Sequence, residues 1–141
     1  MTVNQISVFV ENKPGALAQI AAELVAGGVN MRALSIAETN DFGVLRFIAD
    51  DDRKAAFVLS DADYVLTVTP VLAVVIRDEP GSFAAALKVL ADAGIDVEYI
   101  YAFLTPRPGS ACMIFRVADN DAAARILTEA GVVLAKREEF L

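Results

Sequence analysis

The sequence predicts an α+β protein built from two copies of one β-α-β-β-α-β unit. In each unit we expect an antiparallel sheet with both helices on one face. The prediction starts from a repeat: NKPGALAQIAAELVAGGVN at 12–30 returns 66 residues later as DEPGSFAAALKVLADAGID at 78–96. Apolar runs separated by turn residues then follow each copy in the same order, so the repeat extends over most of the chain.

The residue pattern of the first copy predicts six helices and strands. Apolar β-rich runs favour strands, and Leu17, Ile20 and Leu24 recur at helical spacing. Pro14 suits the first turn of that helix, and Gly27-Gly28 ends it. The expected ranges in order are strand 5–10, helix 14–26, strands 29–38 and 44–49 around a turn at 39–43, helix 50–60 and strand 63–69.

The second copy repeats the order. Its expected ranges are strand 71–77, helix 80–93, strand 95–105, a turn at 106–110, strand 111–118, helix 119–130 and strand 132–138. Only Thr69-Pro70 joins the copies, so we predict domains at 1–68 and 69–141. A β-α-β-β-α-β unit forms a four-stranded antiparallel sheet covered by helices on one side, which is the ferredoxin-like arrangement.

Composition excludes several classes of function. The net charge is −7 and neither half offers a basic face, which argues against nucleic acid and anionic membranes as partners. No apolar run approaches the ~20 residues of a spanning helix, and no signal peptide is evident, so we expect a cytoplasmic protein. There is no histidine, and the one cysteine, Cys112, lies in a predicted strand. We therefore expect no enzyme, no cofactor and no metal site; Asp50–Asp52 is expected to begin a helix.

The loop after the first strand is the candidate ligand site. Backbone N–H groups and the dipole at a helix start attract a carboxylate, and Gly15 lets a ligand approach the backbone. Asn12 can both donate and accept, as a ligand with an ammonium and a carboxylate requires. Asn30 opens the next strand, which we expect beside the first strand, so both asparagines can face one pocket. Alternatively, Asn12 only caps the helix and Asn30 is only a turn residue.

The repeated motif resembles the opening of an ACT domain, a small regulatory module of amino-acid-metabolism enzymes. The tandem layout, with AETNDFGVLRF at 37–47, resembles stand-alone double-ACT proteins of bacteria. The resemblance implies sheets paired side by side, a homodimer, and an amino acid bound at the domain interface as an allosteric effector. It implies a partner enzyme of amino-acid metabolism. The alternative is an interaction or structural regulatory subunit with no functional ligand site.

By this resemblance the loop asparagine maps onto Asn12 and the asparagine that opens the second strand maps onto Asn30. Serine-regulated members carry a histidine where this chain has Val10, which puts serine specificity in doubt. The apolar setting of Val10 and Leu34 favours an uncharged, branched or aromatic ligand. The complete set of expected ligand-binding residues is Val10, Glu11, Asn12, Lys13, Pro14, Gly15, Ala16, Asn30, Met31, Asp78, Gly81 and Asp96.

The second copy departs from the first at both asparagines, because Asp78 and Asp96 replace them. Two carboxylates at one site would repel a ligand carboxylate. We therefore expect the principal site at Asn12. The second copy would bind another pole of the ligand, bind weakly, or only pair with the first. The aromatic set Tyr99, Tyr101 and Phe103 is expected in the core or an interface, not as a platform for RNA bases.

Overall fold

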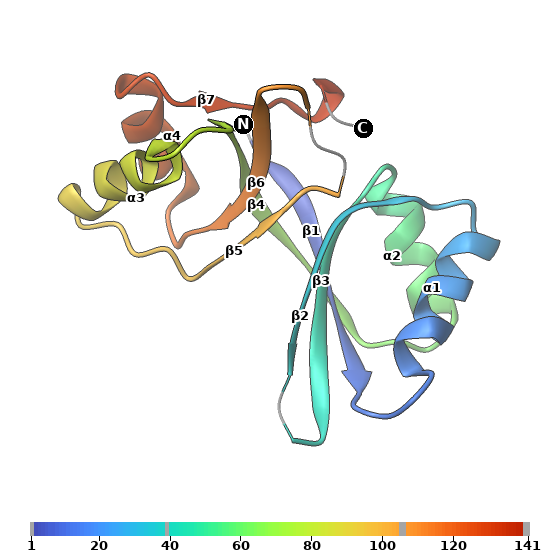
Figure 1. Cartoon of the computed structure of the whole chain (residues 1–141). Coiled ribbons are helices and arrows are strands. Elements are labelled where there is room, and N and C mark those ends of the chain that lie inside the picture. The colour runs from blue at the N-terminus through green and yellow to red at the C-terminus, as the bar shows by residue number, and fades with distance from the viewer. Residues whose placement is uncertain (1, 39, 105–106, 140–141) are drawn as a thin grey trace. The chain divides into compact units, whose positions relative to one another are not determined.

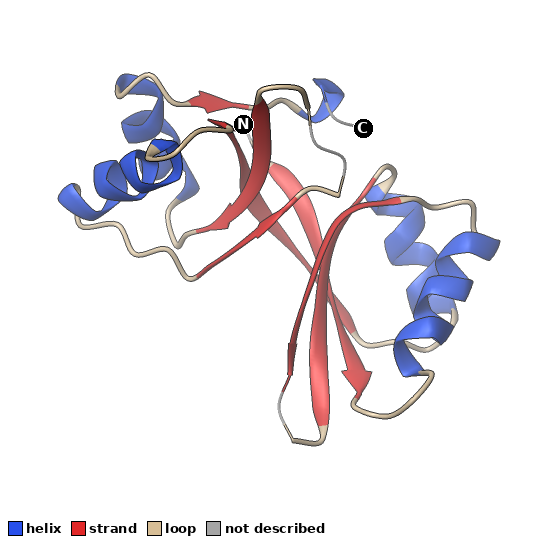
Figure 2. Ribbon diagram, in the orientation of Figure 1, coloured by secondary structure: helices blue, strands red, loops and turns tan. Residues whose placement is uncertain are grey.

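The computed structural model describes residues 2–38, 40–104 and 107–139. It divides into two compact units, which we call the first unit, Asn4–Thr69, and the second unit, which runs from Pro70 onward and includes the residues before Asn4. In each unit strands form an antiparallel sheet and two helices cover one of its faces (Figure 1; Figure 2). The predicted fold class, two ferredoxin-like repeats, is confirmed.

The first unit follows the predicted order of elements. These are β1 (Val3–Glu11), α1 (Ala16–Ala26), β2 (Met31–Glu38), β3 (Phe42–Ala49), α2 (Asp52–Asp61) and the beginning of β4 (Leu66–Arg77). The strands lie in the order β2-β3-β1-β4. β3 therefore separates β1 from β2, and both pair with it antiparallel. This corrects the expectation that the second strand lies beside the first.

The pairing register fixes which residues share an end of this sheet. Glu11 lies opposite Phe42, and Glu38 lies opposite Gly43, so the ends of β1 and β2 meet the start of β3. Met31 lies opposite Ala49 at the other end of β3. The interval from Phe42 to Ala49 spans about 23 Å at ~3.3 Å per residue.

The core of the first unit lies between the sheet and its helices. One face of α1 and one face of α2 pack on alternate residues of β1 and β3, as the strand period of two requires. The buried residues of this cluster are Ile6, Val8, Val10, Ile20, Leu24, Val29, Leu45, Phe47, Ala49, Ala55 and Leu59.

The second unit repeats this plan with shorter strands. It contains the end of β4, then α3 (Ser82–Asp92), β5 (Tyr99–Ala102), β6 (Ser110–Arg116), α4 (Asn120–Glu129), β7 (Val133–Leu134) and the 3₁₀ helix η1 (Arg137–Glu139). The strand order is β7-β4-β6-β5. Its core cluster contains Leu72, Val74, Ile76, Ala86, Leu90, Phe115, Val117, Ala123, Leu127 and Leu134.

The first helix of each unit begins later than predicted, because the glycine before it has a left-handed backbone conformation. α1 begins at Ala16 and α3 at Ser82, two residues after the prolines that were expected to start them. Gly15 and Gly81 have φ of +85° and +92°, a left-handed conformation that cannot continue a right-handed helix. Pro14 and Pro80 therefore lie in the turn that leads into the helix, and the glycines are the N-cap residues.

The other predicted boundaries also shift. The strands expected at 63–69 and 71–77 are one strand, β4, because Pro70 takes the extended backbone without needing to donate a hydrogen bond. Asp63, with φ of +67°, delays its start to Leu66. The strands expected at 95–105 and 132–138 are shorter, and η1 occupies part of the latter. Thr39, Thr105 and Pro106 of the expected hairpins lie outside the described residues.

Candidate functional site

The loop between β1 and α1 is held by backbone hydrogen bonds. The N–H of Asn12 donates to the carbonyl of Asp41 at 3.1 Å, which ties the loop to the β2–β3 hairpin. The N–H of Ala16 donates to the carbonyl of Lys13 at 3.3 Å. A Cβ placed on Gly15 would have no neighbour within 4 Å, so glycine is needed there for its backbone conformation and not to avoid a clash.

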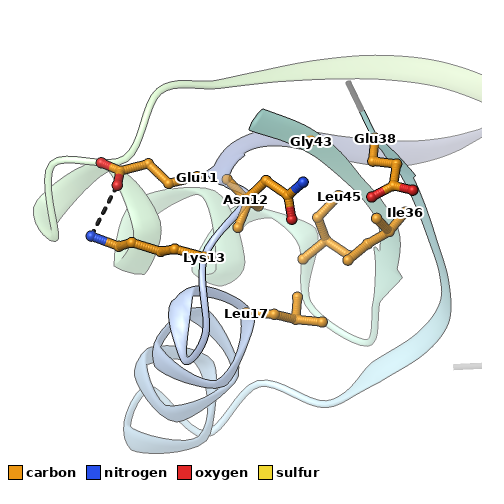
Figure 3. A pocket seen from close by; sticks show the side chains of 9 residues that line it. Glu11, Asn12, Lys13, Leu17, Ile36, Glu38, Gly43 and Leu45 are labelled. Carbon is orange, nitrogen blue, oxygen red and sulfur yellow. Dashed lines mark ion pairs between the residues drawn. The ribbon is translucent and has the colours of Figure 1, made fainter. Parts of the chain in front are cut away.

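A cavity of about 200 Å³ lies beside this loop, entirely within the first unit (Figure 3). Its apolar lining comes from the end of β1, the first turn of α1 and the hairpin: Val10, Leu17, Ile36 and Leu45. Its polar lining consists of Glu11, Asn12, Lys13 and Glu38, and Gly43 completes it. An apolar floor with a few polar groups at the rim is the usual composition of a small-molecule site.

The polar groups of the cavity have different orientations. The carboxamide of Asn12 points toward the hairpin, on the side where Glu38 and Gly43 lie (Figure 3). Lys13 extends the other way and forms an ion pair with Glu11 at 2.9 Å. The hydrogen bond that Lys13 donates to the Glu11 carboxylate, together with the negative charge of Glu11, raises the pKa of Lys13. Lys13 is therefore cationic and already paired, whereas Asn12 and Glu38 face the space where a ligand would lie.

The expected site residues separate into groups. Val10, Glu11, Asn12 and Lys13 come together in the cavity. Ala16 instead lines a neighbouring cavity of about 290 Å³ toward β4, which also includes Val10, Glu11 and Lys13. The turn residues Pro14 and Gly15 line neither cavity.

Asn30 lies at the opposite end of the sheet from Asn12. Its N–H donates to Oδ1 of Asp50 at 3.0 Å, and its carbonyl accepts from the N–H of Asp50. The adjacent Met31 packs against the core. The expectation that Asn12 and Asn30 face one pocket is wrong within a single unit. β1 and β2 both pair antiparallel with β3 and therefore run parallel, so the end of β1 and the start of β2 lie at opposite ends of the sheet.

The second unit separates its two aspartates in the same way. The N–H of Asp78 donates to the carbonyl of Gly109 at 3.1 Å, next to the start of β6. Asp96 precedes β5, whose first residue lies opposite Arg116 at the end of β6. The carboxylates of Asp78 and Asp96 therefore do not share a site within this unit, and they do not repel each other there. Gly81 lies at the start of α3, as Gly15 does at α1.

The second unit fills the position of Leu17 with a larger side chain. Phe83 occupies that position in the repeat, and its ring packs edge-on against Phe115 at a centroid distance of 6.3 Å. Toward β7 lies a cavity of about 360 Å³, lined by Arg77, Glu79 and Ser82 among others. Its lining includes the repeat counterparts of the residues that line the 290 Å³ cavity, with the charges of Glu11 and Lys13 reversed.

Most of the cavity wall lies outside the loop that the sequence predicts as the site. Leu17, Ile36, Glu38, Gly43 and Leu45 line the cavity. Leu34, which was expected to face the ligand, packs against the core instead. The missing signal was the hairpin register: once Glu38 is paired with Gly43, alternation along the strand places Ile36 and Leu45 opposite each other on the helix-covered face.

Three further properties of the described residues concern metal binding, thiol reactivity and membrane-spanning helices. No group of three or more His, Cys, Asp or Glu side chains among them could hold a metal ion. Burial raises the pKa of the Cys112 thiol to about 11, which disfavours the reactive thiolate. Within the same residues, the helices are all too short or too polar to cross a bilayer.

Comparisons with known proteins agree on the fold. The sequence model of the family described as "ACT domain pair" matches residues 1–140. A protein from Bacteroides thetaiotaomicron with a solved crystal structure is 33% identical, with a TM-score of 0.92 over 99% of this chain and 96% of that one. No curated protein matches.

More distant structures share the arrangement. The regulatory subunit of aspartate kinase from Thermus thermophilus, in its ligand-free form, is 18% identical with a TM-score of 0.66, covering 90% of this chain and 91% of that one. The corresponding subunit from Thermus flavus is 16% identical with a TM-score of 0.63, covering 91% and 92%. At these identities the likeness shows the fold alone.

Proposed function

This chain belongs to the family of ACT domain pairs, and from that premise we propose that it is a non-catalytic regulatory module that binds a free amino acid. The ligand would occupy the cavity beside Asn12, and the occupied state would be read by a metabolic enzyme or another partner. The regulatory subunits of aspartate kinase that share the fold support a regulatory role.

The main support for the proposal is that two polar groups, on Asn12 and Glu38, lie beside an apolar lining in one cavity. The Asn12 carboxamide can donate to a ligand carboxylate, and the Glu38 carboxylate can accept from a ligand ammonium. The ligand side chain would lie on Leu17, Ile36 and Leu45. A volume of about 200 Å³ is below the roughly 300–1,000 Å³ of sites for drug-sized molecules, which suits one small amino acid with an apolar side chain.

The other expected residues take supporting roles in this proposal. Pro14, Gly15 and Ala16 set the conformation of the loop. Asn30 and Met31 are too far from Asn12 to reach the same ligand within one unit, so they would contribute only to a ligand held between two ACT units. Asp78, Gly81 and Asp96 would serve such a composite site from the second unit. A homodimer and a cytoplasmic location fit this role.

The experiment is calorimetric titration of the full chain with each of the twenty amino acids. We expect binding of an uncharged apolar amino acid. Asn12→Ala should weaken it at least about tenfold, because hydrogen bonds to charged groups contribute roughly 1.5–3 kcal/mol. Asn40→Ala, a change of the same kind in the exposed hairpin, is the matched control and should bind normally.

Two further outcomes decide the details. If Asn30→Ala also abolishes binding without loss of folding, the site is composite and two ACT units hold one ligand. If none of the twenty amino acids binds at millimolar concentration, the ligand proposal fails and a regulatory subunit that acts through protein contacts alone takes its place.

A further inference from the structure

The outer surface of α2 in the first unit carries a row of three exposed residues at intervals of four. Arg53, Phe57 and Asp61 follow one another along this helix, and all three are exposed. We call them the α2 row. Phe57 is 71% exposed although it is a large apolar side chain. Residues four apart form one of the ridges by which helices pack on each other.

The three side chains of the α2 row do not contribute to the stability of the first unit in a way that would explain their placement. The buried side of α2 is provided by Ala55 and Leu59, which belong to the core of the first unit. Arg53 lies in the first turn of the helix and Asp61 is its last residue. The helix dipole favours the reverse placement, with acidic residues first and basic residues last. The ion pairs found among the described residues do not involve either side chain.

The row is complementary to a second copy of itself. When two α2 helices lie antiparallel about a two-fold axis at Phe57, the two phenyl rings meet and Arg53 of each copy lies opposite Asp61 of the other. Such a contact is isologous and closes after two copies. We propose that α2 of the first unit is a self-association surface that binds a second copy of this chain. The α2 row supplies both its apolar centre and its charge pairing.

The neighbouring helix extends the apolar part of this surface. α1 lies beside α2 on the same side of the sheet (Figure 1). It exposes Ala22, Val25 and Ala26, with Val25 75% exposed. Helices of this length bury less than the ~800 Å² per partner of a standard interface. The self-association should therefore be weak, with a dissociation constant on the order of micromolar or above.

The second unit has the corresponding pair of helices, but their exposed residues are not complementary to those of a second copy. The repeat positions of the α2 row on α4 are Asp121, Arg125 and Glu129, and all three are exposed. Two antiparallel α4 helices would place Arg125 against Arg125 and Asp121 against Glu129, so like charges would meet. On α3, Lys88 and Asp92 replace Ala22 and Ala26 and form an ion pair. The self-complementary pattern is therefore specific to the first unit.

Sedimentation velocity of the full chain over a range of concentrations tests the proposal. We expect a monomer–dimer equilibrium. Phe57→Arg, which copies the residue of α4, should weaken it about 30-fold or more, as expected for the central residue of an interface. Arg125→Glu on α4 is the matched control and should leave it unchanged. A chain that is monomeric at every concentration, or a dimer that Phe57→Arg leaves intact, overturns the proposal.

A charge exchange tests the predicted register. Arg53→Asp alone and Asp61→Arg alone should each weaken dimerisation about tenfold, because each turns two attractive pairs into two repulsive ones. The double variant should restore it, since the same pairs re-form with their signs exchanged. Failure of the double variant to recover, with thermal melts showing all variants folded, contradicts the antiparallel pairing. This test uses no amino-acid ligand, so its outcome is independent of the proposed function.

Discussion

The two ACT units use the same backbone plan but differ in the side chains that face outward. Both start their first helix after a glycine with positive φ, and both cap their second helix with an aspartate. Where the first unit has Leu17 beside a cavity, the second has Phe83 packed on Phe115. The two units thus share their caps and turns, whereas the side chains beside the cavity differ.

The largest expected effect tests the shared core. Leu59→Ala and Leu127→Ala remove matched, fully buried side chains from the two units. Each should lower the free energy of unfolding of its own unit by about 3 kcal/mol, through lost burial and a residual cavity. Hydrogen exchange of peptides from each unit measures this. Equal acceleration in both units after a single substitution would show that the units unfold as one body.

A smaller effect is expected at the matched glycines. Gly15→Ala and Gly81→Ala introduce a Cβ that meets no atom within 4 Å, so only the backbone conformation is strained. Each should cost about 1–2 kcal/mol. Thermal melting measures the loss of stability. A loss at one glycine without a comparable loss at the other would mean that the two loops are not equivalent.

The helix caps should respond equally. Asp51 accepts from the N–H of Lys54 and Asp119 accepts from the N–H of Ala122, both at 3.0 Å. Replacement of either by alanine should destabilise the protein by about 1 kcal/mol, and replacement by asparagine by much less, since asparagine also caps. Urea unfolding distinguishes these values. An unchanged midpoint for Asp51→Ala would exclude the cap as a source of stability.

The smallest effect concerns a contact that only the second unit has. Lys88 and Asp92 form an ion pair, but their side chains are 75% and 66% exposed. Lys88→Ala should therefore change stability by less than about 0.5 kcal/mol, and salt should remove the difference. Chemical unfolding at two salt concentrations measures it. A loss above about 1 kcal/mol would indicate that the side chain packs more closely than its exposure suggests.

The sequence was sufficient for the fold because the repeat supplied each element twice. A helical pattern such as Leu17, Ile20 and Leu24 has one simple interpretation when it returns at Phe83, Ala86 and Leu90. Boundaries were less accurate because they depend on backbone conformations, such as the positive φ of Gly15 and Asp63, that residue types alone do not determine.

The candidate site was only partly predictable. The residues of the loop, Val10 to Lys13, are adjacent in the sequence and also line the cavity. Asn30 was misplaced because the connection through α1 returns the chain to the far end of the sheet. β2 therefore runs parallel to β1, and its first residue lies about a strand length from the end of β1. The opposite wall, Ile36 and Glu38, required the register of the hairpin.

A methyl NMR titration of the full chain, with the amino acid that binds best in calorimetry, shows directly which unit holds the ligand. We expect the largest shifts at the methyl groups of Leu17, Ile36 and Leu45 in the first unit, and we expect Asn12→Ala to require at least about tenfold more ligand to produce them. The repeat counterpart of Leu45, Met113 in the second unit, should change little. Shifts that concentrate at Met113 instead, or that appear at the same ligand concentration in Asn12→Ala, would contradict the assignment of the ligand site to the first unit.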